Sequence, residues 1–226
     1  MPLYPLGICR GEDLQRVPEQ IAAGAASVRW SHVEELACAV IDARANALKP
    51  IQHAAAIEAI HRCVCVLPMR FGTIAHDEAE IRDLLQPRRG ELLERLNRLE
   101  GTCEMAIRIT SGSPQNIARD ESSQGFHAAT SSASNYLEQR RAHYRRVDAA
   151  EEIGRSMVQK VVQRLQGTFR DWRRLPSWPL SPGIRMEFLV EQSRVADFRS
   201  RLENLHTAGR GGRCMVLGPW APYSFA

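Results

Sequence analysis

The chain has 226 residues, of which 44% are apolar and 25% are charged. These values are ordinary for a globular protein with a buried core, and they exclude a disordered or collagen-like chain. The net charge of +4 is small, so electrostatic contacts are expected from one basic segment and not from the whole surface.

The N-terminal stretch MPLYPLGICRGED contains no basic leader followed by an apolar run. No stretch of the chain approaches the ~20 apolar residues of a membrane helix. We therefore expect a cytoplasmic protein that makes no membrane contact. Its six cysteines are expected to be reduced and buried.

Residues 1–110 carry a β-ββ-α-β-α-β pattern. Helices are expected to begin at Pro50 and after Asp77, an N-cap candidate with Glu80 three residues on, and the second helical pattern ends at Gly101. Strands are expected over Leu3–Cys9, Ser27–Val33, Leu36–Ile41, Cys63–Leu67 and Thr102–Ile109. The pattern indicates an open α+β layer, close to a modified ferredoxin-like domain.

Residues 111–133 are rich in Ser, Gly, Asn and Thr, which is typical of a linker or mobile loop. A helical spacing of apolar residues then runs from Tyr136 to Trp172, with Gly167 as a possible break. The proline-rich PSWPLSP ends it, and a strand over Arg185–Val190, a helix over Arg194–His206 and a strand over Cys214–Leu217 follow. Residues 134–226 are therefore expected to form a second α+β domain, with a long helix and an aromatic tail.

The segment Ser134–Arg174 carries ten basic and five acidic residues. Its stretch RRAHYRR and the later AGRGGR raise the alternative of a nucleic-acid-binding module on a ferredoxin-like fold. AGRGGR precedes a strand and not a helix N-terminus, and the chain contains no RNP-like motif. We therefore favour a solvated helix face and a turn.

Cys63 and Cys65, with His61 nearby, are the best metal candidates in the chain. On a strand the two sulfurs would point to one face. Zinc sites, however, prefer two to four residues between such ligands and usually take a second pair, which the sequence lacks. We favour a plain core strand and expect no bound metal.

The sequence shows no catalytic constellation. His53 and His61 could share one helix, but there is no H-E-x-x-H and no G-x-S-x-G. Acidic neighbours such as Glu34–Glu35 and Glu151–Glu152 read as solvated faces. We expect no enzyme activity and no cofactor. An enzyme using the Cys63/Cys65 region is kept as a third hypothesis.

Three stretches together change this interpretation: VLPMRFGTI at residues 66–74, YLEQRR at residues 136–141 and LGPWAPYSF near the C-terminus. In this order and spacing they resemble the gas vesicle GvpL/GvpF family, and the opening LYPLGICRG resembles its first strand. The match spans about Tyr4 to Phe225, and the terminal motif is its most specific element. Two departures are Ala221, where the family often has proline, and Pro5, which suggests that the first strand lies at an edge or starts late.

The resemblance implies a non-enzymatic accessory or minor structural protein, an assembly factor for the gas vesicles that give cells buoyancy. It implies contacts with the hydrophobic gas vesicle shell protein and with other accessory proteins, a location at the gas vesicle, and no cofactor. Composition and spacing alone would not name this function. The residues that carry the motifs, for a structural role or for partner contact, are Pro68, Arg70, Phe71, Gly72, Tyr136, Leu137, Gly218, Pro219, Trp220, Pro222, Tyr223 and Phe225.

The aromatic tail is expected to be structural. Gly218 and Pro219 would turn it, and Trp220, Tyr223 and Phe225 would pack across a domain surface. A docking peptide for a partner is the alternative. Arg70 is expected to anchor the Phe71–Gly72 turn by an internal ion pair. A shell subunit would need an apolar surface or a free strand edge, and an edge strand could supply the latter by β-augmentation.

Overall fold

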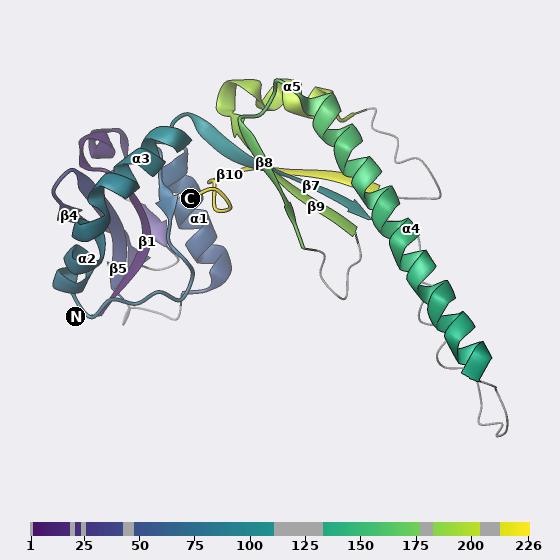
Figure 1. The fold of residues 1–226 in the computed structure, drawn as a ribbon. Coiled ribbons are helices and arrows are strands. Elements are labelled where there is room, and N and C mark those ends of the chain that lie inside the picture. The colour runs from purple at the N-terminus through teal and green to yellow at the C-terminus, as the bar shows by residue number, and fades with distance from the viewer. Residues whose placement is uncertain are drawn as a thin grey trace. The chain divides into compact units, whose positions relative to one another are not determined.

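A computed structural model describes residues 2–18, 21–23, 26–42, 48–110, 133–176, 183–203 and 213–226. The described side chains exclude those of 22–23, 26, 133–139, 142–143 and 145–150. The fold is mixed α/β with two four-stranded sheets, ordered β4-β5-β1-β6 and β10-β7-β9-β8 (Figure 1). The linker predicted for residues 111–133 lies almost entirely outside the described residues, as does most of PSWPLSP.

The chain forms two compact units that are not contiguous in sequence. Unit 1 comprises Met1–Met105, Leu189–Ser193 and Gly218–Ala226, and unit 2 comprises Ala106–Phe188 and Arg194–Leu217. The division differs from the predicted boundary at residue 110, because the chain crosses between the units within strands β7, β9 and β10. The aromatic tail thereby belongs to unit 1, although the rest of its strand belongs to unit 2.

The first sheet lies wholly in unit 1. Its strands are β4 (Arg29–Val33), β5 (Leu36–Asp42), β1 (Leu3–Arg10) and the two-residue β6 (Leu67–Pro68). The pairs β4–β5, β5–β1 and β1–β6 are antiparallel. The predicted hairpin at Glu34–Glu35 is confirmed, with Glu34 at φ 53°. A separate small ribbon pairs β2 (Ala22–Ala23) with β3 (Ala26–Ser27).

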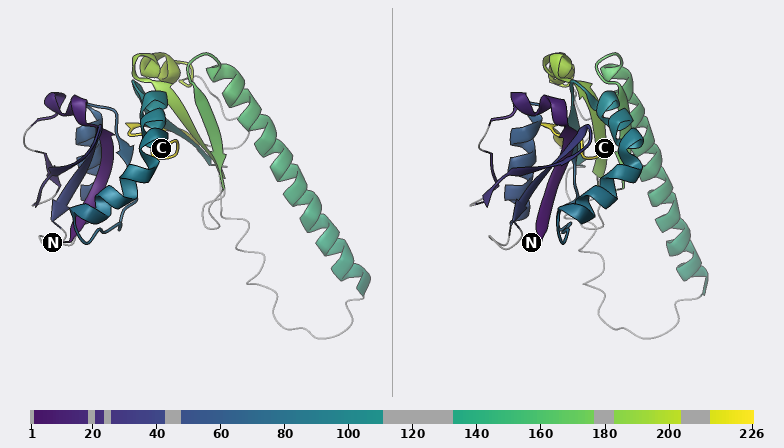
Figure 2. Two further views of the ribbon diagram at one scale, coloured as in Figure 1. Left: turned by 60° about the vertical axis from the view of Figure 1, so that its left-hand side comes forward. Right: turned by 90° about the vertical axis from the view of Figure 1, so that its left-hand side faces the viewer.

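Helices cover both faces of this sheet (Figure 2). Alternate β5 residues face opposite ways, as strand geometry requires. Leu36, Cys38 and Val40 pack with α2 (Glu78–Leu85) and α3 (Arg89–Leu99). Ala37, Ala39 and Ile41 pack with α1 (Pro50–His61). Whether the N-terminal domain is a modified ferredoxin-like fold stays a prediction.

Two predictions about the strands of unit 1 are wrong. β1 is neither an edge strand nor a late start: a register shift between Pro5 and Gly7 absorbs the proline, and β5 and β6 flank the strand. The apolar run Cys63–Leu67 is mostly not a strand, because Cys63–Val66 form a turn and a buried loop before the short β6.

The helix starts follow local chemistry. Pro50 opens α1, where the Gln52 side chain accepts a hydrogen bond from the Lys49 N–H at 2.9 Å. The predicted N-cap Asp77 is confirmed, because its carboxylate accepts the Glu80 N–H at 3.0 Å. In a capping box the Glu80 side chain would accept the N–H of the N-cap residue Asp77. Here it accepts the N–H of His76, one residue earlier.

Unit 2 contains the long helix α4 (Ala133–Leu165), β8 (Asp171–Leu175) and α5 (Val195–Ser200), together with most of β7 (Thr102–Thr110), β9 (Gly183–Glu191) and β10 (Arg213–Trp220). Elsewhere along the chain there are also three 3-10 turns, η1 (Gly11–Arg16), η2 (Gln86–Arg88) and η3 (Gln192–Arg194). Phe188 on β9 is fully buried, and its ring meets those of Phe169, Trp172 and Phe198 at centroid distances of 5.2, 6.2 and 5.3 Å.

The long helix is shorter than predicted. It ends at Leu165, and Gly167 adopts φ 86°, a left-handed conformation that stops a helix. Trp172, placed on the helix by its spacing, lies in β8 instead. The last helix is also shorter, covering Val195–Ser200 of the expected Arg194–His206, whereas the last strand extends to Trp220.

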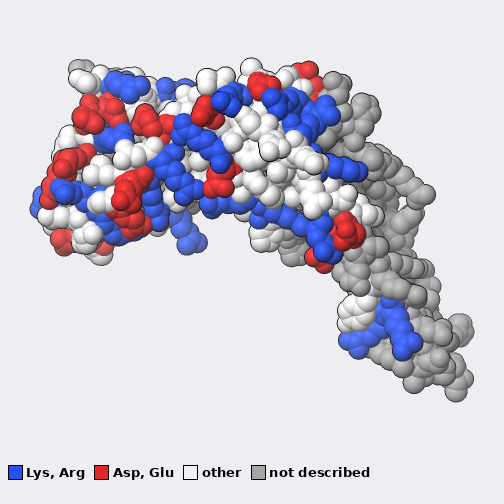
Figure 3. Space-filling view, turned by 45° about the horizontal axis from the view of Figure 1, so that its top comes forward, with Lys and Arg blue, Asp and Glu red and all other residues white. Residues whose placement is uncertain are grey.

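The two units have opposite charge. In the sequence, unit 1 holds 12 basic and 16 acidic residues, a net of −4, and unit 2 holds 18 and 10, a net of +8. On the face shown in Figure 3, acidic and basic side chains mix over unit 1, whereas basic ones predominate over the described part of unit 2. The positive charge is therefore a property of unit 2 and not of the whole protein.

Candidate functional site

The C-terminal tail begins at a glycine that no other residue could replace without strain. Gly218 has φ 102°, and a Cβ there would lie 2.6 Å from the backbone oxygen of Glu104 on β7. The following Gly218–Pro219 peptide bond is cis. The close approach places the tail directly against β7, which explains a glycine at this position of the motif.

Two carboxylates hold the tail by its backbone. Glu58 on α1 accepts the Ala221 N–H at 2.8 Å. Glu104, only 5% exposed, accepts the Ser224 N–H at 2.7 Å and the Ser224 hydroxyl at 3.0 Å. Burial raises the pKa of Glu58, with the Ala221 bond opposing it. Such charge-assisted bonds to a buried carboxylate fix the tail in one conformation.

The tail side chains divide into buried and exposed. Phe225 and Ala221 are buried, and Phe225 joins the core on the α2–α3 side of the sheet. Trp220 is 37% exposed and Tyr223 is 41% exposed. Trp220 and Tyr223 are thus covered only in part, and packing of these two rings across a domain surface stays a prediction. Burial, with the Glu58 and Glu104 charges, raises the pKa of Tyr223 to about 12, so the phenol is neutral at physiological pH.

The VLPMRFGTI motif at residues 66–74 continues from β6 into a loop beside α1. The hydroxyl of Tyr4 accepts the Gly72 N–H, and the His53 ring bonds the Met69 carbonyl at 3.1 Å. The rings of Tyr4, His53 and Phe71 lie within 5.5–6.0 Å of one another. Phe71 is nonetheless 42% exposed. The hydrogen bonds from Gly72 to Tyr4 and between His53 and Met69 hold the loop in place, while the Phe71 ring stays partly exposed to solvent.

Arg70 does not anchor this loop as predicted. Its side chain is exposed, and within the described residues its guanidinium makes no ion pair. The anchor is its carbonyl, which accepts the N–H and the hydroxyl of Thr73 at 3.2 and 2.8 Å. The turn is thus closed by backbone and by Thr73. The other motif residues, Tyr136 and Leu137, lie on α4, and their side chains are outside the described part.

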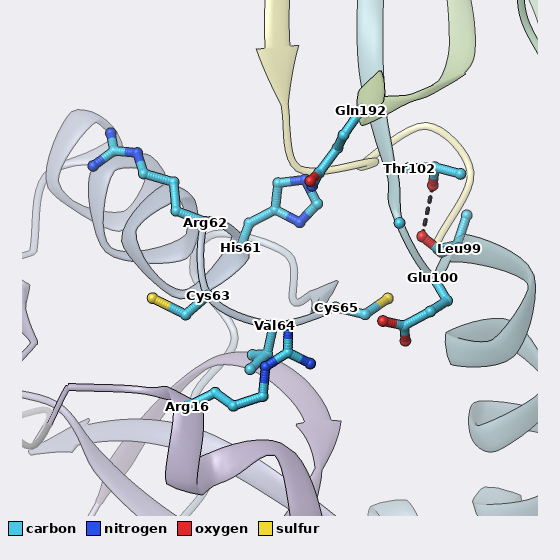
Figure 4. A pocket seen from close by; sticks show the side chains of 11 residues that line it. Arg16, His61, Arg62, Cys63, Val64, Cys65, Leu99, Glu100, Thr102 and Gln192 are labelled. Carbon is cyan, nitrogen blue, oxygen red and sulfur yellow. Dashed lines mark hydrogen bonds between the residues drawn. The ribbon is translucent and has the colours of Figure 1, made fainter. Parts of the chain in front are cut away.

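The cysteine region does not assemble a metal site. Cys63 and Cys65 point apart (Figure 4), with their thiols donating to the carbonyls of Ala59 at 3.6 Å and Leu96 at 3.5 Å. Burial raises the pKa of Cys65 to about 12, so this thiol stays protonated. Within the described ranges no three His, Cys, Asp or Glu side chains are placed to share a metal ion.

A small cavity of about 100 Å³ lies beside these cysteines. His61, 7% exposed, borders it, and neither ring nitrogen has a hydrogen-bond partner. Burial lowers the pKa of His61, so the ring is neutral near pH 7. Arg16 and Glu100 line the same cavity (Figure 4). With a donor, an acceptor and a neutral imidazole at its walls, the cavity suits ordered water.

The acidic neighbours on the hairpin are solvated, as expected. Glu34 and Glu35 both pair with Arg89 of α3, at 2.5 and 2.9 Å, and all three side chains are at least 43% exposed. Glu151 and Glu152 are exposed on α4. Of the helices in the described ranges, none combines the length and apolar character needed to cross a bilayer.

Sequence reasoning did not identify Glu58 and Glu104 as tail anchors. The available signal was Glu104 itself, the single carboxylate in the predicted strand Thr102–Ile109. A buried carboxylate in a strand requires donors, but the sequence does not say that those donors belong to a segment 120 residues away.

Comparisons with known proteins agree with the motifs. The family model for "Gas vesicle synthesis protein GvpL/GvpF" matches residues 2–226. Gas vesicle protein L of Streptomyces sp. (strain CB03234) is 29% identical over 187 residues, covering 77% of this chain and 67% of that protein. Gas vesicle protein F of the same strain is 28% identical over 169 residues, covering 71% and 69%.

Two solved structures have the same fold. The crystal structure of the gas vesicle protein GvpF from Anabaena sp. PCC7120 superposes with a TM-score of 0.74 at 19% identity, covering 99% of this chain and 95% of that one. The GvpF structure from Microcystis aeruginosa gives 0.68 at 17% identity, covering 99% and 98%. With a family match over nearly its full length, the chain belongs to the GvpL/GvpF family of gas vesicle synthesis proteins and takes part in gas vesicle formation.

Proposed function

We propose that this protein is a non-catalytic accessory factor that binds the hydrophobic gas vesicle shell protein during assembly, at the gas vesicle and in the cytoplasm. It would also contact other accessory proteins, without nucleic acid, membrane or cofactor. Family membership supports the assembly role. The tail supports the contact, because buried Glu104 holds its backbone while the rings of Trp220 and Tyr223 stay 37% and 41% exposed.

The exposed rings are the observation that carries the proposal. Aromatic side chains are enriched in the centres of protein interfaces, where they contribute a large share of the binding free energy. Trp220 and Tyr223 belong to a segment whose backbone is already ordered. Because little conformational entropy would be lost on binding, such a segment is well suited to hold an apolar partner.

The Phe71 loop is a second exposed apolar surface in unit 1. Phe71 and Ile74 are 42% and 59% exposed on a loop fixed by Tyr4 and His53. We propose that it adds area to the shell-protein surface. A shell subunit that aggregates in water would be retained by such contacts even when ionic attractions are screened.

Co-purification tests the proposal. The tagged protein is co-expressed with the shell protein of the same genome and washed at high salt. We expect the wild type to retain the shell protein, and a W220A/Y223A double variant to lose most of it. Y144A is the matched control, because Tyr144 is a 54% exposed aromatic ring on α4, in unit 2 and outside both the tail and the Phe71 loop in sequence.

Two results would contradict the proposal. The first is the absence of the shell protein from the wild-type eluate at every salt concentration. The second is an equal loss of the shell protein in W220A/Y223A and Y144A, which would mean that retention does not depend specifically on the tail rings. Circular dichroism of each variant verifies that the fold is intact.

A further inference from the structure

The edge strand β10 of unit 2 lacks the features that usually protect a sheet edge. Natural edge strands are kept from pairing with other chains by charged side chains, by proline or by short length. β8, the opposite edge of the same sheet, holds Asp171, Arg173 and Arg174 in a short strand. β10 instead carries an apolar run, Cys214–Leu217, with no charge and no proline in it. Such a run is a template to which a strand of another chain can pair.

The two edges of the sheet in unit 1 are protected. β6 is only two residues long and contains Pro68. β4 is also short, and it exposes the polar or charged side chains of Arg29 and His32. Among the four edges of the two four-stranded sheets, β10 is therefore the one without such protection.

The two faces of β10 are less covered than those of its neighbour β7. Successive residues of a strand face opposite sides of the sheet. Ala106 and Ile107 of β7 are both fully buried, so both faces of that strand are covered. All residues of the run Cys214–Leu217 keep part of their surface in solvent, and Met215 is 49% exposed. An added strand beside β10 would bury more of this apolar surface.

The charge near β10 selects the kind of strand that fits. Arg213, the first residue of β10, is exposed and makes no ion pair within the described residues. Unit 2 as a whole has a net charge of +8. A second copy of this chain would bring the same positive charge to the edge, whereas a strand that carries a carboxylate would be attracted to it.

We propose that β10 binds an extended apolar segment of another protein, which adds a strand to the four-stranded sheet of unit 2. Backbone N–H and C=O groups of the segment would pair with the open edge of β10, which is the mode of β-augmentation. In an antiparallel arrangement, a carboxylate at the C-terminal end of the segment would lie beside Arg213 at the start of β10. This contact is separate from the tail in unit 1 and does not depend on binding of the shell protein.

Fluorescence anisotropy on the full chain tests the strand pairing. The probe is a short, labelled, acetylated peptide in which valine and threonine alternate before a C-terminal glutamate. Two control peptides carry N-methyl groups on alternate residues, in the two possible registers, so that each lacks the N–H groups of one edge only. We expect saturable binding of the probe, a loss of at least about tenfold in affinity for one control peptide, and a change of less than about threefold for the other.

Variants of the protein locate the binding at β10. M215K adds a charge to the exposed apolar run and should weaken the probe by about tenfold. I153K makes the same kind of change on α4, where Ile153 is 68% exposed, and should leave the affinity within about threefold. R213E should weaken the probe by about fivefold, and should bind a peptide with lysine in place of glutamate more tightly than the wild type does.

Several results would overturn the proposal. Absence of probe binding would do so, as would equal affinities of the two N-methylated peptides, because one edge of the peptide would then not be used. Equal losses in M215K and I153K would mean that the probe binds elsewhere. A free protein that is a dimer, and that M215K dissociates, would mean that a second copy occupies the edge. W220A/Y223A should bind the probe as the wild type does, so a failure at β10 and a failure at the tail are distinguishable.

Discussion

Unit 1 and unit 2 expose different chemistry. Unit 1 is acidic, with a net charge of −4. Its exposed aromatic rings lie on the C-terminal tail and on the Phe71 loop, and hydrogen bonds hold the backbone of both segments. Unit 2 has a net charge of +8, and its buried core is built around the ring of Phe188. The difference leads us to predict that contacts made by unit 1 would be insensitive to salt, whereas contacts made by unit 2 would weaken as salt screens its charge.

The sharpest contrast lies within the tail, between a buried and an exposed ring. F225A removes a core side chain and should lower the free energy of unfolding by about 3–5 kcal/mol. W220A removes a ring that is 37% exposed and should cost about 1–2 kcal/mol. Urea unfolding of both variants measures the difference. Equal losses would mean that the division into buried and exposed rings is mistaken.

The entry to the tail should be the next most sensitive position. G218A places a Cβ 2.6 Å from the Glu104 carbonyl at φ 102°, and should cost at least about 2 kcal/mol. G101A is the control, because Gly101 has φ 66° with open space around it, and it should cost about 1 kcal/mol. If G218A costs no more than G101A, the tail does not rest on β7 as closely as described.

The buried histidines of unit 1 should make its stability depend on pH. Burial lowers the pKa of His53 and His61 in the folded state, so the unfolded chain takes up protons first as the pH falls. Stability is then fully present above about pH 6.5 and declines below it, by up to about 1.4 kcal/mol per pH unit for each histidine.

Replacement of one histidine isolates its share. H61L should flatten the decline in urea unfolding free energy between about pH 6.5 and 5, a range that begins at the histidine pKa of about 6.5 in the unfolded chain. H32Q, at an exposed position of β4, should leave the slope unchanged. If the unfolding free energy depends on pH equally in H61L and in the wild type, burial of the His61 ring is not a source of the pH dependence.

The smallest effect is expected for the surface ion pairs of the hairpin. R89A removes the partner of Glu34 and Glu35, all of which are solvated. We expect a slightly lower melting temperature at low salt and no difference from the wild type at about 0.5 M salt, where such pairs are screened. A loss that persists at high salt would indicate packing by the arginine stem.

Much of the order of elements could be predicted from the sequence, because strong local signals set it. Pro50, Asp77 and Gly101 mark helix ends by backbone chemistry that needs no tertiary context. The hairpin at Glu34–Glu35 follows from two apolar runs around a polar pair. The family was identified from motifs whose physical roles, at Gly218 and Gly72, concern backbone conformation.

The errors share a cause, which is that burial does not require regular structure. Cys63–Val66 is apolar because it is a buried loop, and Phe169 and Trp172 continue a helical spacing because both enter the same core after the helix has ended. The tail contacts could not be predicted either, since Glu58 and Glu104 meet it only through the fold. Exposure of Trp220 and Tyr223 is likewise a tertiary property.

Hydrogen exchange with mass spectrometry tests the central claim most directly. The protein is compared alone and in complex with the co-expressed shell protein, at high salt. We predict added protection of the amides of residues 218–226 and 69–75 in unit 1, and little change in β8 and α5 of unit 2. Unchanged exchange at the tail, with protection confined to unit 2, would contradict the account.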